Sequence, residues 1–368
     1  MKKIIFCQTP FQIIVSLFIK EQIKNINDQV ELVIVDTFND YQIIAERIQK
    51  AKIFEQVHVV CAQELIKTKG LKNIKKFFSI IFLKHTMKKI FGKEISLYDE
   101  MYYWNYDAFI ASFRSYQEIK GKKIKNFIYD EGYISYMPID EVIPKKNFLK
   151  LIEKINSIRG IKSVKRENTD GILLFEPEFI IKKPSYPVIR LNNTIDKQIL
   201  KKYLAKIFEA ESVIKKYDRK FILFEEAMLA NQETVDDFSI FNNIVNFVGK
   251  DNVIIKLHPR TKKNRFRDLG VKILGSDGIP WEAVMLLGDF KDKVLITIGS
   301  GSITNCRLIF GGNITSYMLF RILNIDLPQF NERYIKFWND IGNPQYGKGL
   351  TIPTDEKIFW ESLREQIK

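Results

Sequence analysis

Short apolar segments rich in β-branched residues alternate with amphipathic segments along most of this chain. The first half predicts strands over residues 2–7, 29–36, 57–61, 107–112 and 125–129, with helices over 10–25 and 40–51 and a basic helical region after residue 61. The second half predicts strands over 220–224, 253–257, 271–274 and 293–298, with helices over 196–217, 235–248, 280–287 and 354–366, the last capped by Thr354. Alternating strands and helices build βαβ units, so the pattern predicts an α/β protein with mainly parallel sheets.

The alternation falls into two halves of similar length. Residues 138–182 are hard to interpret, apart from a helix expected near 147–157, and residues 182–187 (Lys-Lys-Pro-Ser-Tyr-Pro) have the composition of a linker. A chain of 368 residues is long enough for two hydrophobic cores. We therefore expect an N-terminal domain over 1–185 and a C-terminal domain over 186–368, with strand ends of both facing a cleft.

Composition limits the class of protein. With 46% hydrophobic and 28% charged residues the chain is globular rather than disordered. Three cysteines without CxxC spacing favour a reducing cytosol over a disulfide framework or a metal site. The first residues lack the cleavage site of a signal peptide, and no apolar run has the length of a membrane span.

The net charge of +14 favours an anionic partner, such as an anionic lipid surface or a phosphorylated or acidic substrate. Lysines are densest over residues 67–93, where they are interleaved with Phe, Ile and Leu. This basic amphipathic segment is either a solvated lysine-rich face or a surface that lies on a membrane. No nucleic-acid-binding module is recognisable, so nucleic acid is not an expected partner.

One histidine stands at the predicted end of a strand. Residues 253–257 form an apolar run, and Pro259 cannot continue a central strand because it has no N–H, so His258 is expected at the carboxyl tip. Ligands bind at such tips in open α/β sheets, and Lys256 and Arg260 place cations nearby. The ring is either satisfied locally or directed at a ligand.

Adjacent acids follow another predicted strand. Asp130 and Glu131 come directly after residues 125–129, and Gly132 allows the chain to turn away sharply. Two neighbouring carboxylates raise the pKa of at least one of them, which suits a general base, although solvated acids beside glycine are also common at strand ends.

A glycine- and serine-rich turn follows the strand expected over 293–298. A strand that runs through such a turn into a helix can hold phosphate with free N–H groups and hydroxyls, without a Cβ to block its approach. The turn is neither a Walker loop nor a dinucleotide-binding GxGxxG, and an ordinary capped turn is the alternative. The candidate phosphate ligands are Gly299, Ser300, Gly301, Ser302 and Thr304.

Two further strand ends carry polar residues. The first strand is followed by Thr9, Pro10 and Gln12, of which Pro10 suits a first helical position and the other two are expected to reach the cleft. Glu225 and Glu226 follow the strand at 220–224 and could hold a ribose or a base edge, or supply a carboxylate.

Together these segments resemble the bacterial sialyltransferases. The shared pattern is an acidic D/E-D/E-G stretch, an HP pair and a serine-containing turn, found here as Asp130-Glu131-Gly132, His258-Pro259 and Ser300/Ser302 in that order. The N-terminal segment makes the chain most similar to glycosyltransferase family 52, the lipooligosaccharide and capsule group, with the poly-sialyltransferase family a close second. The serine turn departs from the adjacent serine pair of these families, which leaves open which serine meets phosphate.

The resemblance implies a GT-B fold of two Rossmann-like domains, with the nucleotide site mostly in the second and the last helix packing back on the first. It also implies CMP-sialic acid as donor, inversion at the anomeric carbon, and neither a cofactor nor a metal. The expected acceptor is a cell-surface glycan at the cytoplasmic face of the membrane, and homodimer formation, linkage and acceptor identity are left open. The alternatives are a GT-B transferase that uses another nucleotide sugar, or a non-catalytic, membrane-associated glycan-assembly protein.

Under this resemblance His258, as an imidazolium, neutralises the departing phosphate together with the serine turn. The substrate-binding candidates are Thr9, Pro10, Gln12, Gly132, Glu225, Glu226, Lys256, Pro259, Gly299, Ser300, Gly301, Ser302 and Thr304. The base is expected to be Glu131, or else Asp130. A base from the second domain is the remaining alternative, with Glu225, Glu226 and Asp236 as candidates.

Overall fold

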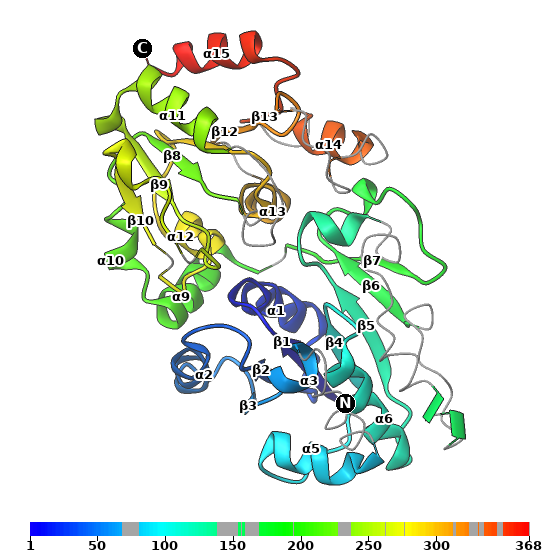
Figure 1. Cartoon of the computed structure of the whole chain (residues 1–368). Coiled ribbons are helices and arrows are strands. Elements are labelled where there is room, and N and C mark those ends of the chain that lie inside the picture. Colours follow the sequence, from blue (N-terminus) through cyan, green and yellow to red (C-terminus); the bar gives the residue numbers. More distant parts are fainter. Residues whose placement is uncertain are drawn as a thin grey trace. The chain divides into compact units, whose positions relative to one another are not determined.

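The computed structural model describes residues 1–67, 81–137, 154–155, 157–158, 169–193, 195–226, 237–261, 263–275, 277–311, 314–323, 330, 335–343 and 349–367. The chain divides into two compact units (Figure 1). The N-terminal unit comprises Met1–Glu131, Pro138–Glu178 and Lys182–Phe208, and the C-terminal unit comprises Gly132–Met137, Phe179–Ile181 and Glu209–Lys368. This division differs from the one expected at residue 185.

The reason for the difference lies just after the expected linker. Strand β7 (Val188–Arg190) extends the N-terminal sheet beside β6 (Gly171–Leu174), with Leu173 opposite Ile189. Helix α9 (Lys197–Phe208) then packs against α2 (Tyr41–Lys50), where Arg47 donates to the carbonyl of Ile207 at 3.3 Å. The segment after residue 185 therefore completes the first unit before the chain enters the second.

The N-terminal unit is built on a seven-stranded parallel sheet with the order β3-β2-β1-β4-β5-β6-β7. Its remaining strands are β1 (Lys2–Cys7), β2 (Gln29–Val35), β3 (Gln56–Val60), β4 (Glu100–Tyr103) and β5 (Lys125–Tyr129). The strand order reverses between β1 and β4, where the chain returns from one edge to the other side of β1. The carboxyl ends of β1, β4 and β5 therefore meet at a switch point, the usual ligand-binding place in such sheets.

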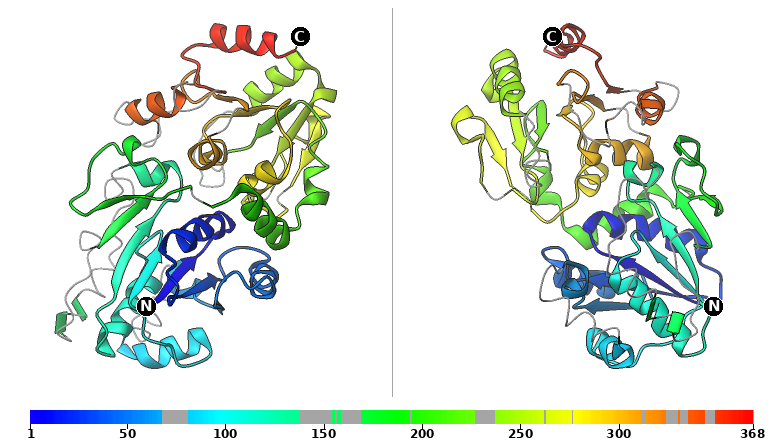
Figure 2. Two further views of the ribbon diagram at one scale, coloured as in Figure 1. Left: turned by 180° about the vertical axis from the view of Figure 1, so that it is seen from behind. Right: turned by 45° about the vertical axis from the view of Figure 1, so that its right-hand side comes forward.

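Helices cover both faces of this sheet (Figures 1 and 2). They are α1 (Pro10–Ile23), α2, α3 (Gln63–Lys67), α5 (Leu83–Phe91), α6 (Ala108–Ile119) and α9. Alternate residues of β1 face opposite helices: Phe6 packs on Phe113 of α6, with ring centroids 4.9 Å apart, whereas Cys7 lies against Ser16 of α1.

The strand expected over 107–112 is wrong, because this segment opens helix α6. The Asp107 carboxylate accepts hydrogen bonds from the N–H groups of Phe109 (2.8 Å) and Ile110 (3.0 Å), which caps the helix at its first turn. The strand lies earlier, at β4, which the sequence pattern did not predict.

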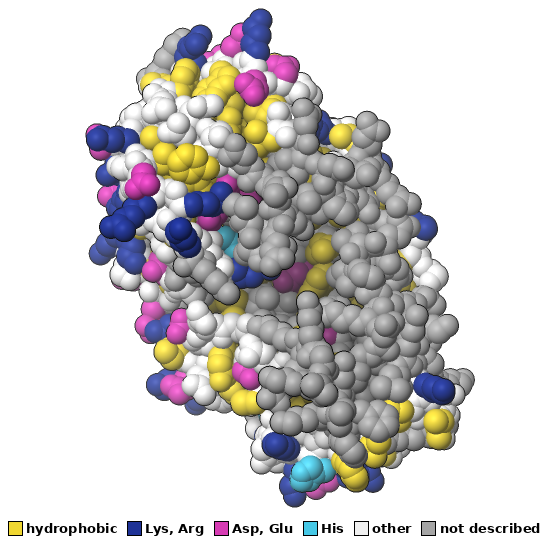
Figure 3. Space-filling view, in the orientation of Figure 1, with side chains coloured by type: hydrophobic (Ala, Val, Ile, Leu, Met, Phe, Trp, Pro, Cys, Tyr) yellow, Lys and Arg dark blue, Asp and Glu magenta, His cyan; other side chains and the backbone are white. Residues whose placement is uncertain are grey.

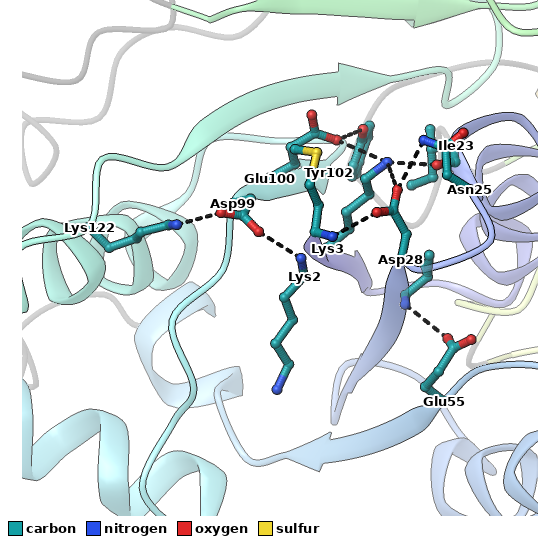
Figure 4. A network of polar contacts seen from close by, with 12 residues as sticks. Lys2, Lys3, Ile23, Asn25, Asp28, Glu55, Asp99, Glu100, Tyr102 and Lys122 are labelled. Atoms are coloured by element: carbon teal, nitrogen blue, oxygen red, sulfur yellow. Dashed lines mark hydrogen bonds and ion pairs between the residues drawn. The ribbon is translucent and has the colours of Figure 1, made fainter.

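Ion pairs close the amino end of this sheet (Figure 4). The Lys3 ammonium contacts the carboxylates of Asp28 at 2.7 Å and Glu100 at 3.6 Å, and the Lys2 N–H donates to Asp99 at 2.7 Å. The N-terminal ammonium also pairs with Asp28 at 2.7 Å. These charges serve the fold, and the polar groups at the carboxyl ends of the strands remain for chemistry.

The C-terminal unit is built on a six-stranded parallel sheet with the order β10-β9-β8-β11-β12-β13. The strands are β8 (Phe221–Phe224), β9 (Val253–Lys256), β10 (Lys272–Leu274), β11 (Val294–Thr297), β12 (Thr315–Met318) and β13 (Leu350–Thr351). The helices are α10 (Glu211–Ile214), α11 (Asp237–Val248), α12 (Trp281–Leu287), α13 (Gly301–Phe310), α14 (Ile335–Gly342) and α15 (Glu356–Glu365). The order reverses between β8 and β11, so this unit has its own switch point.

Two predicted helices differ from the observed ones. The helix expected over 196–217 is interrupted at Glu209, which has a φ of 48° and separates α9 from α10. The last helix is capped by Asp355 rather than Thr354, because the Asp355 carboxylate accepts from the Ile358 N–H at 2.9 Å. This helix packs within its own unit through Tyr317 and Phe359, with ring centroids 5.5 Å apart, and its expected packing on the first domain stays a prediction.

Two short segments of the first half of the chain belong to the C-terminal unit. The 3-10 helix η2 (Tyr133–Tyr136) stacks on α14 through Tyr133 and Trp338, 5.4 Å apart, and through Tyr136 and Phe337, 5.5 Å apart. The Ile181 N–H donates to the carbonyl of Tyr136 at 3.0 Å, which ties the second segment to the first. The helix expected near 147–157 lies largely outside the described residues, as do residues 68–80 of the basic segment.

Candidate functional site

The second sheet brings three of the segments that carry candidate residues to one edge. Strands β9, β8 and β11 are neighbours, with Phe224 opposite both Lys256 and Thr297. The residues that follow these strands are Glu225 and Glu226 after β8, His258 after β9, and Gly299 to Ser302 after β11. All of them therefore lie at the carboxyl edge of the switch point.

His258 begins a tight turn. The Thr261 N–H donates to the His258 carbonyl at 2.9 Å, so residues 258–261 form a β-turn in which Pro259 occupies the favoured second position. The imidazole Nδ1 accepts from the Arg260 N–H at 3.1 Å. Pro259 and Arg260 are exposed, whereas His258 is half-buried.

These contacts determine the charge state of His258. Burial, and then the nearby Arg260 and Lys256 cations, lower the pKa of His258 to about 4. Because Nδ1 accepts a hydrogen bond, the proton of the neutral ring lies on Nε2. A pKa this low favours the neutral ring with its Nε2–H donor over the imidazolium expected from the sequence.

Glu225 holds this turn rather than facing a ligand. Its side chain is only 4% exposed. One oxygen, Oε2, accepts from the His258 N–H at 2.9 Å and from the Thr261 hydroxyl, and the other, Oε1, accepts from Arg265 Nε at 3.2 Å. Since protein donors engage both oxygens, Glu225 is poorly suited to serve as a general base.

Glu226 has a similar role at the neighbouring turn. Its buried carboxylate accepts from the Thr297 hydroxyl and from the Gly299 N–H at 2.8 Å. Burial raises the pKa of Glu226 to about 7, although these hydrogen bonds oppose the shift. Glu226 therefore fixes the start of the serine turn from the inside, and Asp236, the third alternative base, lies outside the described residues.

The serine turn forms the capped start of α13. Ser300 is the N-cap residue, and its hydroxyl accepts from the Ser302 N–H at 3.4 Å. Ser300, Gly301 and Ser302 are half-buried, so solvent reaches this helix start. Thr304 is fully buried and its hydroxyl donates to the Gly301 carbonyl at 3.0 Å, which makes it a structural residue rather than a phosphate ligand.

Gly299 is a glycine for a reason other than the one expected. A Cβ at this position would lie 2.1 Å from Cζ of Phe330, so the absence of a side chain makes room for an aromatic ring of the same unit. Gly301 is different, because its nearest neighbour, the Tyr133 ring, would be 3.5 Å from an added Cβ. Of these two glycines, Gly301 is the one that leaves the expected space for a phosphate to approach.

A buried polar group lies beside these turns. The Asn305 side chain of α13 donates to Glu282 Oε1 at 2.8 Å, and burial raises the pKa of Glu282 to about 7. Lys256 contributes an attractive charge to Glu282, and burial lowers the pKa of this lysine. Gly132 has a φ of 85°, and an added Cβ would lie 2.0 Å from Asn305 Oδ1, so both backbone and packing require glycine there.

The N-terminal unit carries the remaining candidates at the carboxyl ends of β1 and β5. Asp130 is 1% exposed and accepts from the Phe175 N–H at 3.1 Å, which joins the ends of β5 and β6. Glu131 is half-buried, and its Oε1 accepts from the Thr9 hydroxyl at 3.4 Å. Of the two acids, Glu131 has the greater access to a substrate.

Thr9 and Gln12 also differ in their exposure to a substrate. Thr9 is half-buried and caps α1, whose first residue is Pro10, by accepting from the Gln12 N–H at 3.2 Å. The Gln12 side chain is 1% exposed and accepts from the Gln8 N–H at 2.6 Å and from the Tyr129 hydroxyl at 3.2 Å. Gln12 therefore stabilises the turn and does not contact a substrate directly.

Several residues of the C-terminal edge were not predicted from the sequence. They are Thr261, Arg265 and Asp237, which join Glu225 in one network, and Glu282, which interacts with both Lys256 and Asn305. Glu282 carried a weak signal, as the acid in the first turn of an expected helix. Arg265 carried none, because its partners are 28 and 40 residues away.

Within the described ranges no three His, Cys, Asp or Glu side chains converge to form a metal site. In the same part of the chain no helix is long and apolar enough to cross a membrane.

Comparisons with known proteins agree with this architecture. The family model of the alpha-2,8-polysialyltransferases matches residues 3–319, and no curated protein matches the chain. A spinosyn forosaminyltransferase superposes with a TM-score of 0.51 at 8% identity, covering 100% of this chain and 90% of that one, which shows similarity of fold alone.

Two solved sialyltransferases are also similar in outline. The alpha-2,3-sialyltransferase of Photobacterium phosphoreum has a TM-score of 0.48 at 11% identity, covering 95% of this chain and 97% of that one. The sialyltransferase of Photobacterium damsela has a TM-score of 0.49 at 11% identity, covering 96% and 81%. The expected fold class, α/β with two Rossmann-like domains of the GT-B type, is confirmed, and the matching family model is that of the group placed second from the sequence.

Proposed function

Because the chain belongs to the alpha-2,8-polysialyltransferase family, we propose that it transfers sialic acid from CMP-sialic acid to a cell-surface glycan of the capsule or lipooligosaccharide kind. Family membership makes the chain a glycosyltransferase of the sialyltransferase type. The donor, the acceptor, inversion and independence from metal ions are the finer parts of the proposal. The family name favours an acceptor that already ends in sialic acid and an α-2,8 linkage.

The observation that carries the proposal is the state of His258 at the switch point of the second sheet. Its Nδ1 accepts from the Arg260 amide, so the neutral ring offers Nε2–H as a donor at the same sheet edge as the start of α13. The first N–H groups of a helix have no partner within it and favour anions. A leaving phosphate needs such an arrangement, because negative charge collects on it in the transition state.

The reaction then runs as a direct displacement. The acceptor hydroxyl attacks the anomeric carbon of the donor sugar from the face opposite the phosphate, and its proton passes to the Glu131 carboxylate. The new carbon–oxygen bond forms as the bond to the phosphate oxygen breaks, so the electron pair stays on CMP. His258 donates from Nε2 to that phosphate, and Ser300 and Ser302 supply further donors.

The assignment of the base rests on access. Asp130 is buried and engaged with the Phe175 amide, whereas Glu131 is half-buried next to Thr9 at the end of β1. In the other unit protein donors hold Glu225 and Glu226. Glu131 is therefore the candidate that combines a carboxylate with an approach for the acceptor.

The proposed reaction needs no metal ion. In the proposed reaction His258, the hydroxyls of the serine turn and the start of α13 take the place of a divalent cation on the phosphate. The acids near this turn accept hydrogen bonds from the protein: Glu226 accepts from the Gly299 N–H, and Glu282 accepts from the Asn305 side chain.

Peripheral contact with an anionic membrane is a further part of the proposal. On α5, Lys84, Lys88 and Lys89 are exposed, and the preceding Ile81 and Phe82 are 38% and 59% exposed. Basic and apolar groups together favour an anionic lipid surface. Replacement of the three lysines by glutamine should reduce co-sedimentation with phosphatidylglycerol vesicles, and unchanged binding would contradict a role of this helix.

Turnover of the donor without an acceptor tests the central part of the proposal. The purified chain should release free CMP from CMP-sialic acid slowly by hydrolysis, and much faster when an oligosaccharide ending in sialic acid is added. UDP-linked glucose and N-acetylhexosamine should release no nucleotide. Release of UDP but not of CMP would replace this function with transfer from another nucleotide sugar, and release of neither nucleotide would favour a non-catalytic protein.

A further inference from the structure

Arg265 joins two buried carboxylates in the C-terminal unit. Both of its terminal nitrogens contact the carboxylate of Asp237, and its Nε donates to Glu225 Oε1 at 3.2 Å. Asp237 is fully buried and Glu225 is 4% exposed. The guanidinium also lies over the Phe266 ring, 4.5 Å from the centroid. We call Glu225, Asp237 and Arg265 the arginine clamp.

The clamp orients Glu225 toward the His258 turn. Because Arg265 holds Oε1, the second oxygen, Oε2, is directed at the His258 N–H (2.9 Å) and the Thr261 hydroxyl. A single carboxylate oxygen thus contacts both the first and the last residue of the turn. Arg265 touches neither residue through a hydrogen bond of its own, so any effect on them passes through Glu225.

Holding both ends of the turn fixes the imidazole. The His258 ring accepts from the Arg260 N–H only while residues 258–261 keep the turn closed by the Thr261 N–H and the His258 carbonyl, 2.9 Å apart. The group on one ring nitrogen decides which nitrogen carries the proton. If the turn opens, Nδ1 loses its donor and the ring can adopt either tautomer.

We propose that Arg265 is a positioning residue, which acts through Glu225 to hold the 258–261 turn so that His258 presents Nε2–H to the donor phosphate. The part that concerns the phosphate rests on the proposed function, whereas the effect on the ring does not. Asp237 completes the device by anchoring the guanidinium to the first turn of α11.

The charges around His258 make this positioning measurable. The groups that face the ring are the Arg260 and Lys256 cations, and together with burial they lower its pKa. Glu225 accepts from its backbone N–H. A ring released from the turn gains contact with water and moves away from these cations, so it should titrate closer to the ordinary value of 6.5.

Histidine NMR spectroscopy reads the ring directly. The chain has three histidines, so the signals of His58, His85 and His258 can be assigned with single variants. In the wild type, His258 should show one tautomer with an unprotonated Nδ1 and should not titrate above about pH 5. Arg265→Met should give a mixture of tautomers and a higher pKa, and kcat for transfer should fall about 10- to 100-fold, as it does when a metal-bound histidine loses the partner that orients it.

Two further variants keep the test valid if Arg265→Met folds poorly. Thr261→Val removes one donor to Glu225 without leaving a buried carboxylate without its cation, and it should produce a smaller change in the same direction. Arg265→Lys keeps the charge but cannot contact both acids with a planar fork, so it should restore folding but not the single tautomer.

Arg219→Met is the matched control. Arg219 lies in the same unit, with a side-chain exposure of 28% against 25% for Arg265, and it pairs with Asp251 at 3.6 Å. This variant should leave the His258 spectrum and kcat unchanged. An unchanged His258 spectrum in both Arg265→Met and Thr261→Val would overturn the positioning role.

The same data separate this inference from the proposed function. If His258→Ala transfers sialic acid normally, the role of His258 in the reaction fails, but the spectrum of Arg265→Met still reports whether the clamp orients the ring. If His258→Ala is inactive and Arg265→Met keeps both its kcat and the wild-type spectrum, the clamp inference fails alone.

Discussion

Substitution of Gly299 by alanine should destabilise the C-terminal unit through a clash with one ring. The added Cβ would lie 2.1 Å from Cζ of Phe330, whereas unbonded carbon atoms normally approach to about 3.5–4.0 Å. Gly299 is held by the Glu226 carboxylate at 2.8 Å, and the Phe330 ring stacks on Phe320 with centroids 4.6 Å apart. Since neither partner can move freely, the free energy of unfolding should fall by about 1–3 kcal/mol.

A double-mutant cycle isolates this clash. Urea unfolding is measured for the wild type, Gly299→Ala, Phe330→Leu and the double variant. Phe330→Leu costs stability by itself, but it removes the atoms that the new Cβ meets, so alanine should cost at least about 1 kcal/mol less in that background. An equal cost in both backgrounds would refute the packing argument. Lost activity with unchanged stability would instead indicate that a ligand needs the glycine.

The remaining predictions concern the base, the buried acids and metal ions. Glu131→Gln should abolish transfer, while CMP binding measured by calorimetry changes by less than about 1 kcal/mol, because a base acts in the transition state. Asp130→Asn should lower transfer less, since its amide oxygen can still accept from the Phe175 N–H. An inactive Asp130→Asn beside an active Glu131→Gln would exchange the two roles. Glu226 has a folded pKa of about 7, above its ordinary 4.5, so the folded state retains a proton that the unfolded state loses in this window. The Glu226 contribution to stability should therefore fall by up to about 1.4 kcal/mol per pH unit as the pH rises from 4.5 to 7, and urea unfolding of Glu226→Gln should show a correspondingly shallower slope than the wild type. EDTA should leave transfer unchanged, and activity lost on chelation and restored by Mg²⁺ or Mn²⁺ would contradict the role given to the serine turn.

The parts of the fold that the sequence predicted are those with a strong local signal. Apolar β-branched runs such as 2–7, 125–129 and 253–257 form central parallel strands within one residue of the expected bounds. The segment after Asp107 looked similar, but the capping carboxylate favours a helix there. Strand β12 was missed because Thr315–Met318 is short and mixed in character, and its burial comes from neighbouring strands rather than from its own pattern.

For the candidate site, too, the sequence predicted some features and not others. The sequence predicted that Glu225, Glu226, His258 and the serine turn lie at one sheet edge, because they follow predicted strands and the carboxyl ends of parallel strands meet. The function of each side chain did not follow. Whether Glu225 faces a substrate or the protein depends on Arg265, which is 40 residues away in the chain. The charge of His258 depends first on its burial, which the local sequence does not reveal, and its tautomer depends on the Arg260 amide.

The most direct test of the central claim is the rate of transfer by His258→Ala. CMP release from CMP-sialic acid is followed in the presence of a sialylated oligosaccharide, with circular dichroism to verify that the variant is folded. Removal of a donor that stabilises charge in the transition state typically lowers turnover by at least about 100-fold, and this loss is expected here. A folded His258→Ala variant that transfers sialic acid at the wild-type rate would contradict the account.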